Sequence, residues 1–184
     1  MNRTRVVVAD DLSPVLTTVG TLLRDSFDVV GMISDGRAAL KATLELEPDL
    51  VILDISMPAM SGIEVAQEIK KQGNKAKIVF LTVYEDADTL RACQTAGGLG
   101  YVIKVFMDTD LVPALNQALA GQIFTSHFSS QHDAPQGQTA NPHWQPFNQE
   151  LGNRIQSAGF QPSPGLYSVI AAEASAVFSP KSFW

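Results

Sequence analysis

Acidic side chains directly follow two apolar segments of this sequence, where buried strands are expected to end. Asp10 and Asp11 follow 4–9, and Asp54 follows the uninterrupted apolar run 50–53. Because the carboxyl ends of parallel strands meet at one edge of an open α/β sheet, where ligands bind, these carboxylates are expected to lie close together. A single acid at a strand end is also common as a solvated side chain, so the chemistry depends on its neighbours.

Two other polar side chains end apolar runs in the same way. Thr82 follows 77–81, and Lys104 follows 101–103. Three adjacent carboxylates repel one another unless a cation neutralises them, and hard oxygen ligands with room for water suit Mg²⁺. An aspartate beside such an ion can act as the nucleophile that accepts a phosphoryl group, while a hydroxyl and a lysine contact its oxygens. These residue types therefore predict phosphoryl transfer to Asp54.

The elements that position these side chains alternate regularly. Strands are predicted at 4–9, 28–33, 50–53, 77–81 and 101–103, and helices from Ser13, over 36–46, around 63–69, over about 86–95 and after 108. Strict alternation over about 120 residues implies a parallel sheet with helices on both faces. We therefore predict an α/β fold with a doubly wound, five-stranded parallel sheet.

Local signals predict several boundaries. Ser13 followed by Pro14 indicates a helix with Ser13 as its N-cap. Asp108 or Thr109 is expected to cap the last helix. The loop before the fifth strand is expected to contain three glycines: Gly97, Gly98 and Gly100.

Composition narrows the class of protein. With 184 residues, 45% hydrophobic and 17% charged, the chain is long enough for one ordinary domain and an additional segment. The formal net charge of −6 argues against broad non-specific binding to nucleic acid. The single cysteine, Cys93, excludes an intrachain disulfide and fits a reducing compartment. No signal peptide and no membrane span are expected.

The last 60 residues differ from the rest. They hold six of the ten prolines, both tryptophans and all three histidines, and they have no lasting helical or strand period. We predict a domain at 1–124 and an irregular or disordered tail at 125–184, in which only 166–178 favours a helix. The histidines lack a fourth ligand at a recognised spacing, so they are interpreted as solvated side chains.

Residues 4–122 resemble the receiver domain of two-component response regulators. The motifs that match are VVVADD, LVILDISMPAMSGIE, IVFLT and GYVIK, in this order. The resemblance implies a flavodoxin-like sheet with the strand order 2-1-3-4-5. It also implies that Asp54 is the phosphoacceptor and that a sensor histidine kinase is the partner which phosphorylates it.

The resemblance assigns further roles within the site. Asp11 and Asp54 would ligate Mg²⁺ together with the backbone carbonyl of Ser56, and Asp10 would act mainly through water. Thr82 and Tyr101 would be the switch pair, whose movement remodels the surface around the fourth helix and the fifth strand. Catalysis would be limited to the chain's own phosphorylation and dephosphorylation, in the cytoplasm and away from membranes, and phosphorylation would favour a homodimer.

The sequence departs from the family pattern in two places, and the second defines the main alternative. Lys104 is followed by Val105, where many receivers have proline, so the usual geometry of the loop after the fifth strand is not implied here. The segment ALAGQIF at 118–124 is similar to receivers that lead into a helix-turn-helix domain, yet only Arg154 and Lys181 are basic beyond it. One alternative is therefore a DNA-binding transcriptional regulator whose output domain is truncated or frame-shifted, with no DNA contact expected through the tail as written.

The other alternative is a phosphatase with an aspartate nucleophile. Such enzymes usually place a second acid two residues after the nucleophile to protonate the leaving group. Ser56 occupies that position here, which disfavours the phosphatase.

Overall fold

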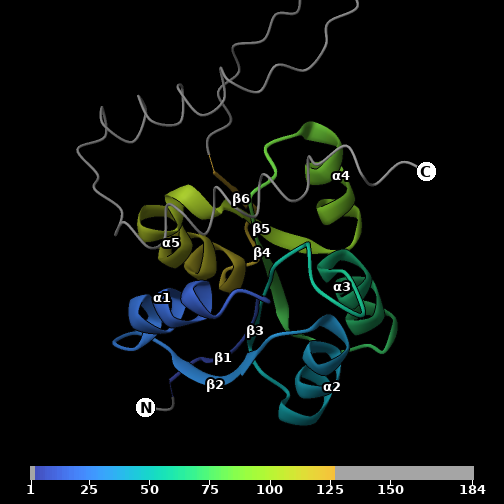
Figure 1. The fold of residues 1–184 in the computed structure, drawn as a ribbon, viewed down its shortest axis with the longest axis horizontal. Helices are drawn as coiled ribbons and strands as arrows, with labels where there is room; N and C mark the ends of the chain where they lie inside the picture. Colours follow the sequence, from blue (N-terminus) through green and yellow to red (C-terminus); the bar gives the residue numbers. More distant parts are fainter. Residues whose placement is uncertain (1–2, 127–184) are drawn as a thin grey trace, which may run out of the picture.

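A computed structural model describes residues 3–126 of the chain. Within this range, five α-helices cover the two faces of one parallel sheet (Figure 1). The strands are β1 (Arg5–Ala9), β2 (Asp28–Ile33), β3 (Leu50–Leu53), β4 (Lys77–Thr82), β5 (Gly98–Ile103) and β6 (Phe124–Thr125). The helices are α1 (Ser13–Leu23), α2 (Gly36–Leu46), α3 (Gly62–Lys71), α4 (Ala87–Thr95) and α5 (Met107–Leu119), and a short 3₁₀ helix, η1 (Lys104–Phe106), precedes α5.

The sheet has the order β2-β1-β3-β4-β5-β6, and all of its strand pairs are parallel. The predicted fold class and the order of the first five strands are confirmed. The sixth strand was not expected. It consists of two residues after α5 that pair with β5, Phe124 opposite Gly100 and Thr125 opposite Tyr101.

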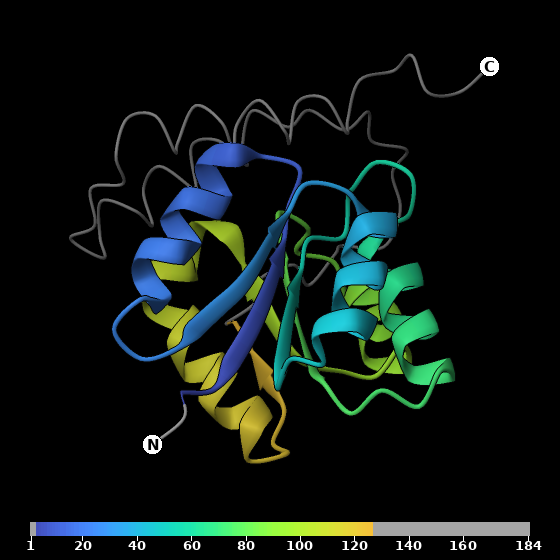
Figure 2. The ribbon, with the colours of Figure 1, turned by 90° about the horizontal axis from the view of Figure 1, so that it is seen from below.

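Both faces of the central strands are covered, and this explains their uninterrupted apolar sequences. Val6 and Val8 of β1 belong to the core beneath α1 and α5, whereas Val7 and Ala9 belong to the core beneath α2, α3 and α4. Figure 2 shows the sheet between these two layers of helices. A strand with only one buried face would have alternated apolar and polar residues.

The start of α1 differs from the prediction. Ser13 is the first helical residue and Leu12 occupies the N-cap position, where no side chain caps the helix. Pro14 lies in the first turn, as expected. Asp10 explains this difference. Its carboxylate accepts a hydrogen bond from the Leu12 N–H at 3.0 Å and fixes the loop so that Leu12, and not Ser13, lies at the N-cap position.

The prediction that Gly98 and Gly100 lie in a loop was wrong, since β5 begins at Gly98. A Cβ atom on either residue would lie 2.7 Å from the side chain of Phe80 or Val79, respectively, on β4. These glycines therefore allow close approach of two strands.

The predicted cap of α5 was also wrong. The helix begins at Met107 with Phe106 in the N-cap position, so Asp108 and Thr109 lie in its first turn. The Thr109 hydroxyl donates back to the Phe106 carbonyl at 3.0 Å. The 3₁₀ helix η1 thus carries the chain from β5 directly into α5, with no separate capping residue.

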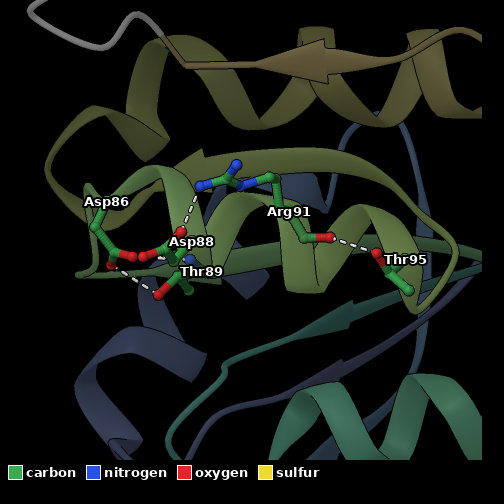
Figure 3. Close-up of polar contacts among 5 residues, drawn as sticks. All are labelled: Asp86, Asp88, Thr89, Arg91 and Thr95. Carbon is green, nitrogen blue, oxygen red and sulfur yellow. Dashed lines mark hydrogen bonds and ion pairs between the residues drawn. The ribbon is translucent and has the colours of Figure 1, made fainter.

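Helix α4 buries only Cys93 and depends on local polar contacts. Asp86 caps it by accepting hydrogen bonds from the Thr89 N–H at 2.8 Å and from the Thr89 hydroxyl at 2.7 Å (Figure 3). Arg91 pairs with Asp88 on the exposed side. Because few apolar contacts tie α4 to the sheet, it is the helix best suited to local rearrangement.

Within residues 3–126, no helix combines the length and the apolar character needed to cross a bilayer. The predicted helix at 166–178 and the three histidines lie outside the described residues. Of the predicted tail, only residues 125 and 126 are described.

Candidate functional site

The carboxyl ends of the central strands bring the predicted side chains to one edge of the sheet. Ala9 at the end of β1 pairs with Leu53 at the end of β3, so the next residues, Asp10 and Asp54, lie side by side. The Asp54 N–H donates to the Ala9 carbonyl at 2.8 Å, which continues the ladder past the formal end of β3. The strand register therefore sets the spacing of the acids.

Three carboxylates gather at this edge. Asp10, Asp11 and Asp54 each offer one oxygen, and these three oxygens all lie within 4.8 Å of one another. Asp10 and Asp54 are only 1% exposed, whereas Asp11 is exposed. Burial raises the pKa of Asp10, and this desolvation outweighs the opposing effect of the neighbouring Lys104.

Lys104 supplies the positive charge within this cluster. Its side chain is fully buried, and its Nζ lies 2.9 Å from Asp10 Oδ2 and 3.4 Å from Asp54 Oδ1. A lysine is rarely buried unless it is paired, so the two ion pairs explain why the Lys104 side chain can be buried. When all three acids are ionised, three negative charges face one positive charge, and the remaining two negative charges match one divalent cation.

The donor set fits Mg²⁺. The carboxylates of Asp10, Asp11 and Asp54 are hard oxygen ligands, and one of them faces solvent, which leaves room for the water molecules that Mg²⁺ retains. The three aspartates that sequence reasoning assigned to a metal are therefore brought together. The assignment of the Ser56 carbonyl as a further ligand stays a prediction.

Thr82 and Tyr101, the expected switch pair, are both linked to a third residue, Tyr84. The buried Thr82 hydroxyl accepts a hydrogen bond from the Tyr84 N–H at 3.2 Å. The Tyr101 hydroxyl donates to the Tyr84 carbonyl at 2.8 Å, and the Tyr101 ring is only 2% exposed. Burial raises the pKa of Tyr101 well above its ordinary range, so its phenol remains a hydrogen-bond donor.

Sequence reasoning missed Tyr84. Its hydroxyl lies 3.1 Å from the Ser56 hydroxyl, and this contact joins the loop after β4 to the loop after β3. The available signal was an aromatic hydroxyl two residues beyond Thr82, in a loop at the ligand-binding edge.

The loop that follows Asp54 requires glycine at position 62. The Gly62 N–H donates to the Ile55 carbonyl at 3.0 Å, and a Cβ atom at Gly62 would overlap the carbonyl oxygen of Asp54. Ser61 then begins α3 through a capping box with Glu64. The turn therefore holds the backbone of Asp54 tightly against the start of α3.

Comparisons with known proteins agree with this geometry. Residues 6–116 match the family described as the response regulator receiver domain. The chain is 35% identical to the transcriptional regulatory protein YvfU of Bacillus subtilis, over 64% of this chain and 60% of that protein. It is 31% identical to the response regulator GacA of Pseudomonas aeruginosa, over 84% of this chain and 73% of that protein.

Among solved structures, the chain is similar to the isolated receiver domain of RcsB from Salmonella enterica in the presence of the phosphomimetic BeF₃⁻. The TM-score is 0.64 at 30% identity, and the match covers 70% of this chain and 97% of that one. The chain thus covers nearly all of a receiver domain, but only about 60% of the length of YvfU.

Proposed function

The chain belongs to the response regulator receiver family, and we propose that it is a phosphoacceptor switch in which Asp54 receives a phosphoryl group from a sensor histidine kinase. The observation that carries the proposal is the buried Lys104 ammonium between Asp10 and Asp54, beside a third carboxylate. This arrangement supports a role for Asp54 as an ionised nucleophile at the edge where the sheet binds ligands.

In the proposed reaction, an oxygen of Asp54 attacks the phosphorus atom of the donor, and the leaving group departs with the electron pair of the broken bond. Lys104 orients the Asp54 carboxylate and offsets negative charge on the phosphoryl oxygens. The Thr82 hydroxyl donates to one of these oxygens. Asp11, Asp54 and the Ser56 carbonyl would hold Mg²⁺, with Asp10 acting through water, and the bound ion would neutralise charge on the transferring group.

The proposed output begins at Tyr84. When the Thr82 hydroxyl turns towards the phosphoryl group, it gives up its hydrogen bond with the Tyr84 N–H. The Tyr84 carbonyl also holds the Tyr101 hydroxyl, so the loop movement reaches β5 and the weakly anchored α4. The altered surface would bind a partner or a second copy of this chain. Catalysis would be limited to self-phosphorylation and self-dephosphorylation, and the expected location is the cytoplasm.

Transcriptional control is a second candidate, favoured by the names of relatives such as YvfU. The match to GacA covers 84% of this chain, more than residues 3–126 alone supply, so similarity continues past the receiver. A gel-shift assay of the full chain at low salt tests this candidate, because even non-specific binding by a basic surface would appear there. A shift would favour a DNA-binding output, and no shift would favour protein partners.

The main proposal is tested by intact-mass measurement after incubation with acetyl phosphate. The wild-type chain is expected to gain one phosphoryl group only when Mg²⁺ is present, and Asp54→Ala is expected to gain none. Asp28→Asn is a matched control, because Asp28 is an exposed acid at the amino end of β2. An adduct on Asp54→Ala, or one that forms equally in EDTA, would contradict the proposal.

A further inference from the structure

Ser126, just after β6, is buried against β5 and α5. Ser126 is only 1% exposed. Its N–H donates to the Tyr101 carbonyl at 2.9 Å, and its hydroxyl donates to Asp110 Oδ2 at 2.6 Å. The same hydroxyl oxygen accepts a hydrogen bond from the Ile103 N–H at 3.2 Å. Ser126 therefore joins the chain beyond α5 to the end of the fifth strand.

The position of the last contact connects Ser126 to the acidic site. Ile103 is the final residue of β5, and the next residue is Lys104, which contacts Asp10 and Asp54. Strand β6 pairs only with Gly100 and Tyr101, so the ladder alone stops short of Ile103. The Ser126 hydroxyl supplies the acceptor for the Ile103 N–H at the point where the backbone turns to present Lys104.

Asp110 sets the direction of this contact. A serine hydroxyl has one hydrogen, and its donation to Asp110 leaves a lone pair of Oγ for the Ile103 N–H. Asp110 Oδ1 also lies 2.9 Å from the Thr109 hydroxyl oxygen, whose single hydrogen is shared between this carboxylate and the Phe106 carbonyl. A hydrogen bond to an ionised acceptor is stronger than one between neutral groups, so the orientation of the Ser126 hydroxyl is well defined.

We propose that Ser126, oriented by Asp110, is a positioning residue for Lys104, and that it couples the chain beyond residue 126 to the Asp54 site. This inference rests on the proposed phosphoacceptor function. The three residues Ser126, Asp110 and Ile103 are called the exit latch below. Because coupling between two sites is reciprocal, phosphorylation changes the exit latch, and a partner that pulls on the following chain changes the placement of Lys104.

The coupling has a second route, which passes through Tyr101. The Tyr101 carbonyl accepts the Ser126 N–H, while its hydroxyl donates to the Tyr84 carbonyl in the loop after Thr82. Tyr101 of β5 thus contacts both the segment after β6, through Ser126, and the loop after β4, through Tyr84. This route uses the backbone of Ser126, so it remains when the hydroxyl alone is removed, and the two routes are separable by substitution.

The test compares Ser126→Ala with Thr125→Ala. The first removes the hydroxyl of the exit latch. The second removes a hydroxyl from the preceding, half-buried residue and keeps the latch. With acetyl phosphate and saturating Mg²⁺, Ser126→Ala is expected to phosphorylate about three- to tenfold more slowly than wild type, the effect of losing one hydrogen bond. Thr125→Ala should stay within about twofold, and Asp110→Asn, whose amide oxygen still accepts the serine hydroxyl, should lie between them.

Hydrogen–deuterium exchange distinguishes coupling from a purely structural role of Ser126, because it measures how the segment responds to the Asp54 site. In the wild-type chain, Mg²⁺ with beryllofluoride is expected to change exchange at 123–126 by about threefold or more. In Ser126→Ala this response should weaken at 123–126, where only the backbone route through Tyr101 remains, and it should be kept around Tyr84. Equal phosphorylation rates and equal exchange responses in wild type and Ser126→Ala would overturn the inference. An effect of Thr125→Ala as large as that of Ser126→Ala would overturn it too.

Failure of the proposed function gives a different result. If the wild-type chain gains no phosphoryl group, that function is wrong, and the coupling is judged with Mg²⁺ alone. A Mg²⁺-dependent change in exchange at 123–126 that is smaller in Ser126→Ala than in wild type would then support the exit latch. An equal change in that variant, or no change in wild type, would refute it.

Discussion

Replacing Asp54 with asparagine is expected to stabilise the fold in the absence of Mg²⁺, although it removes the proposed nucleophile. Asp54 lies beside two other carboxylates and one lysine. Asparagine has nearly the same shape and no charge. The substitution therefore relieves repulsion from Asp10 and Asp11 and gives up attraction to Lys104, and the difference between these two effects sets the sign.

The distances give the magnitude. For oxygens 4.8 Å apart, the limit of the cluster, each repulsion is about 3.5 kcal/mol at an effective dielectric constant of about 20. Two such repulsions come to about 7 kcal/mol, against an attraction of about 5 kcal/mol across the 3.4 Å to Lys104. Because Asp11 is exposed and screened by solvent, the net relief of about 2 kcal/mol falls to about 1 kcal/mol.

Urea unfolding in EDTA and in saturating Mg²⁺ measures this prediction. In EDTA, Asp54→Asn should unfold at a higher urea concentration than wild type with an unchanged slope. A metal that binds only the folded state stabilises it by about 2.7 kcal/mol at a hundred times its dissociation constant. The variant lacks one charged ligand and gains less from Mg²⁺, so the order of stabilities should reverse.

The control is Asp25→Asn, at an exposed acid whose neighbour is the exposed Arg24. It should change stability by less than about 0.5 kcal/mol in both conditions. A lower urea midpoint for Asp54→Asn than for wild type in EDTA would refute the reasoning, because the attraction to Lys104 would then outweigh the repulsion within the cluster.

Three further predictions concern the loops and helices around the site. Burial opposes the shift, but hydrogen bonding to Thr89 lowers the pKa of Asp86 below its ordinary value of 3.8. The ionised carboxylate therefore stabilises the fold above pH 3.8, and this stabilisation is lost as the pH falls through the lowered folded-state pKa. Asp86→Ala should therefore cost about 1 kcal/mol in urea unfolding at neutral pH, and the gap from wild type should close in acid. Burial raises the pKa of the Cys93 thiol from 9.0 to about 12, so a thiol reagent should label the native chain about a thousandfold more slowly than the urea-unfolded chain. Fast labelling of the native chain would show that α4 opens readily. Gly62→Ala should cost about 2–3 kcal/mol in the urea midpoint because its methyl group overlaps the backbone after β3. Gly73→Ala, where φ is +71° and nothing lies within 4 Å, should cost only about 1 kcal/mol, and equal losses would contradict this account of Gly62.

Much of the fold was predictable because each central strand is buried on both faces. Runs such as 50–53 have no polar alternation, and the first polar residue after each run marks the ligand-binding edge. Asp10, Asp54 and Lys104 were predictable for this reason, since local sequence alone places them at strand ends. Their ion pairs confirm that the strand ends converge.

The missed features depend on contacts between distant segments. Gly98 and Gly100 have the propensity of loop residues, but the close approach of β4 places them in a strand. Strand β6 is only two residues long, too short to show a sequence period. It forms because the chain after α5 runs parallel to β5 and pairs with it. The same holds for Tyr84 and Ser126, whose hydroxyls find partners 28 and 16 residues away. No pattern within one segment reveals such partners.

The position of β1 between β2 and β3 has a consequence for the order of folding. β1 pairs with β2 and β3, so Asp10 and Asp54 meet as soon as these three strands associate, whereas Lys104 is synthesised much later. A nascent chain that ends before residue 104 would bury two facing carboxylates without the cation that balances them, and this is costly. The charge imbalance therefore disfavours a partial sheet. We therefore expect the sheet to become more stable when β5 docks and Lys104 pairs with both carboxylates.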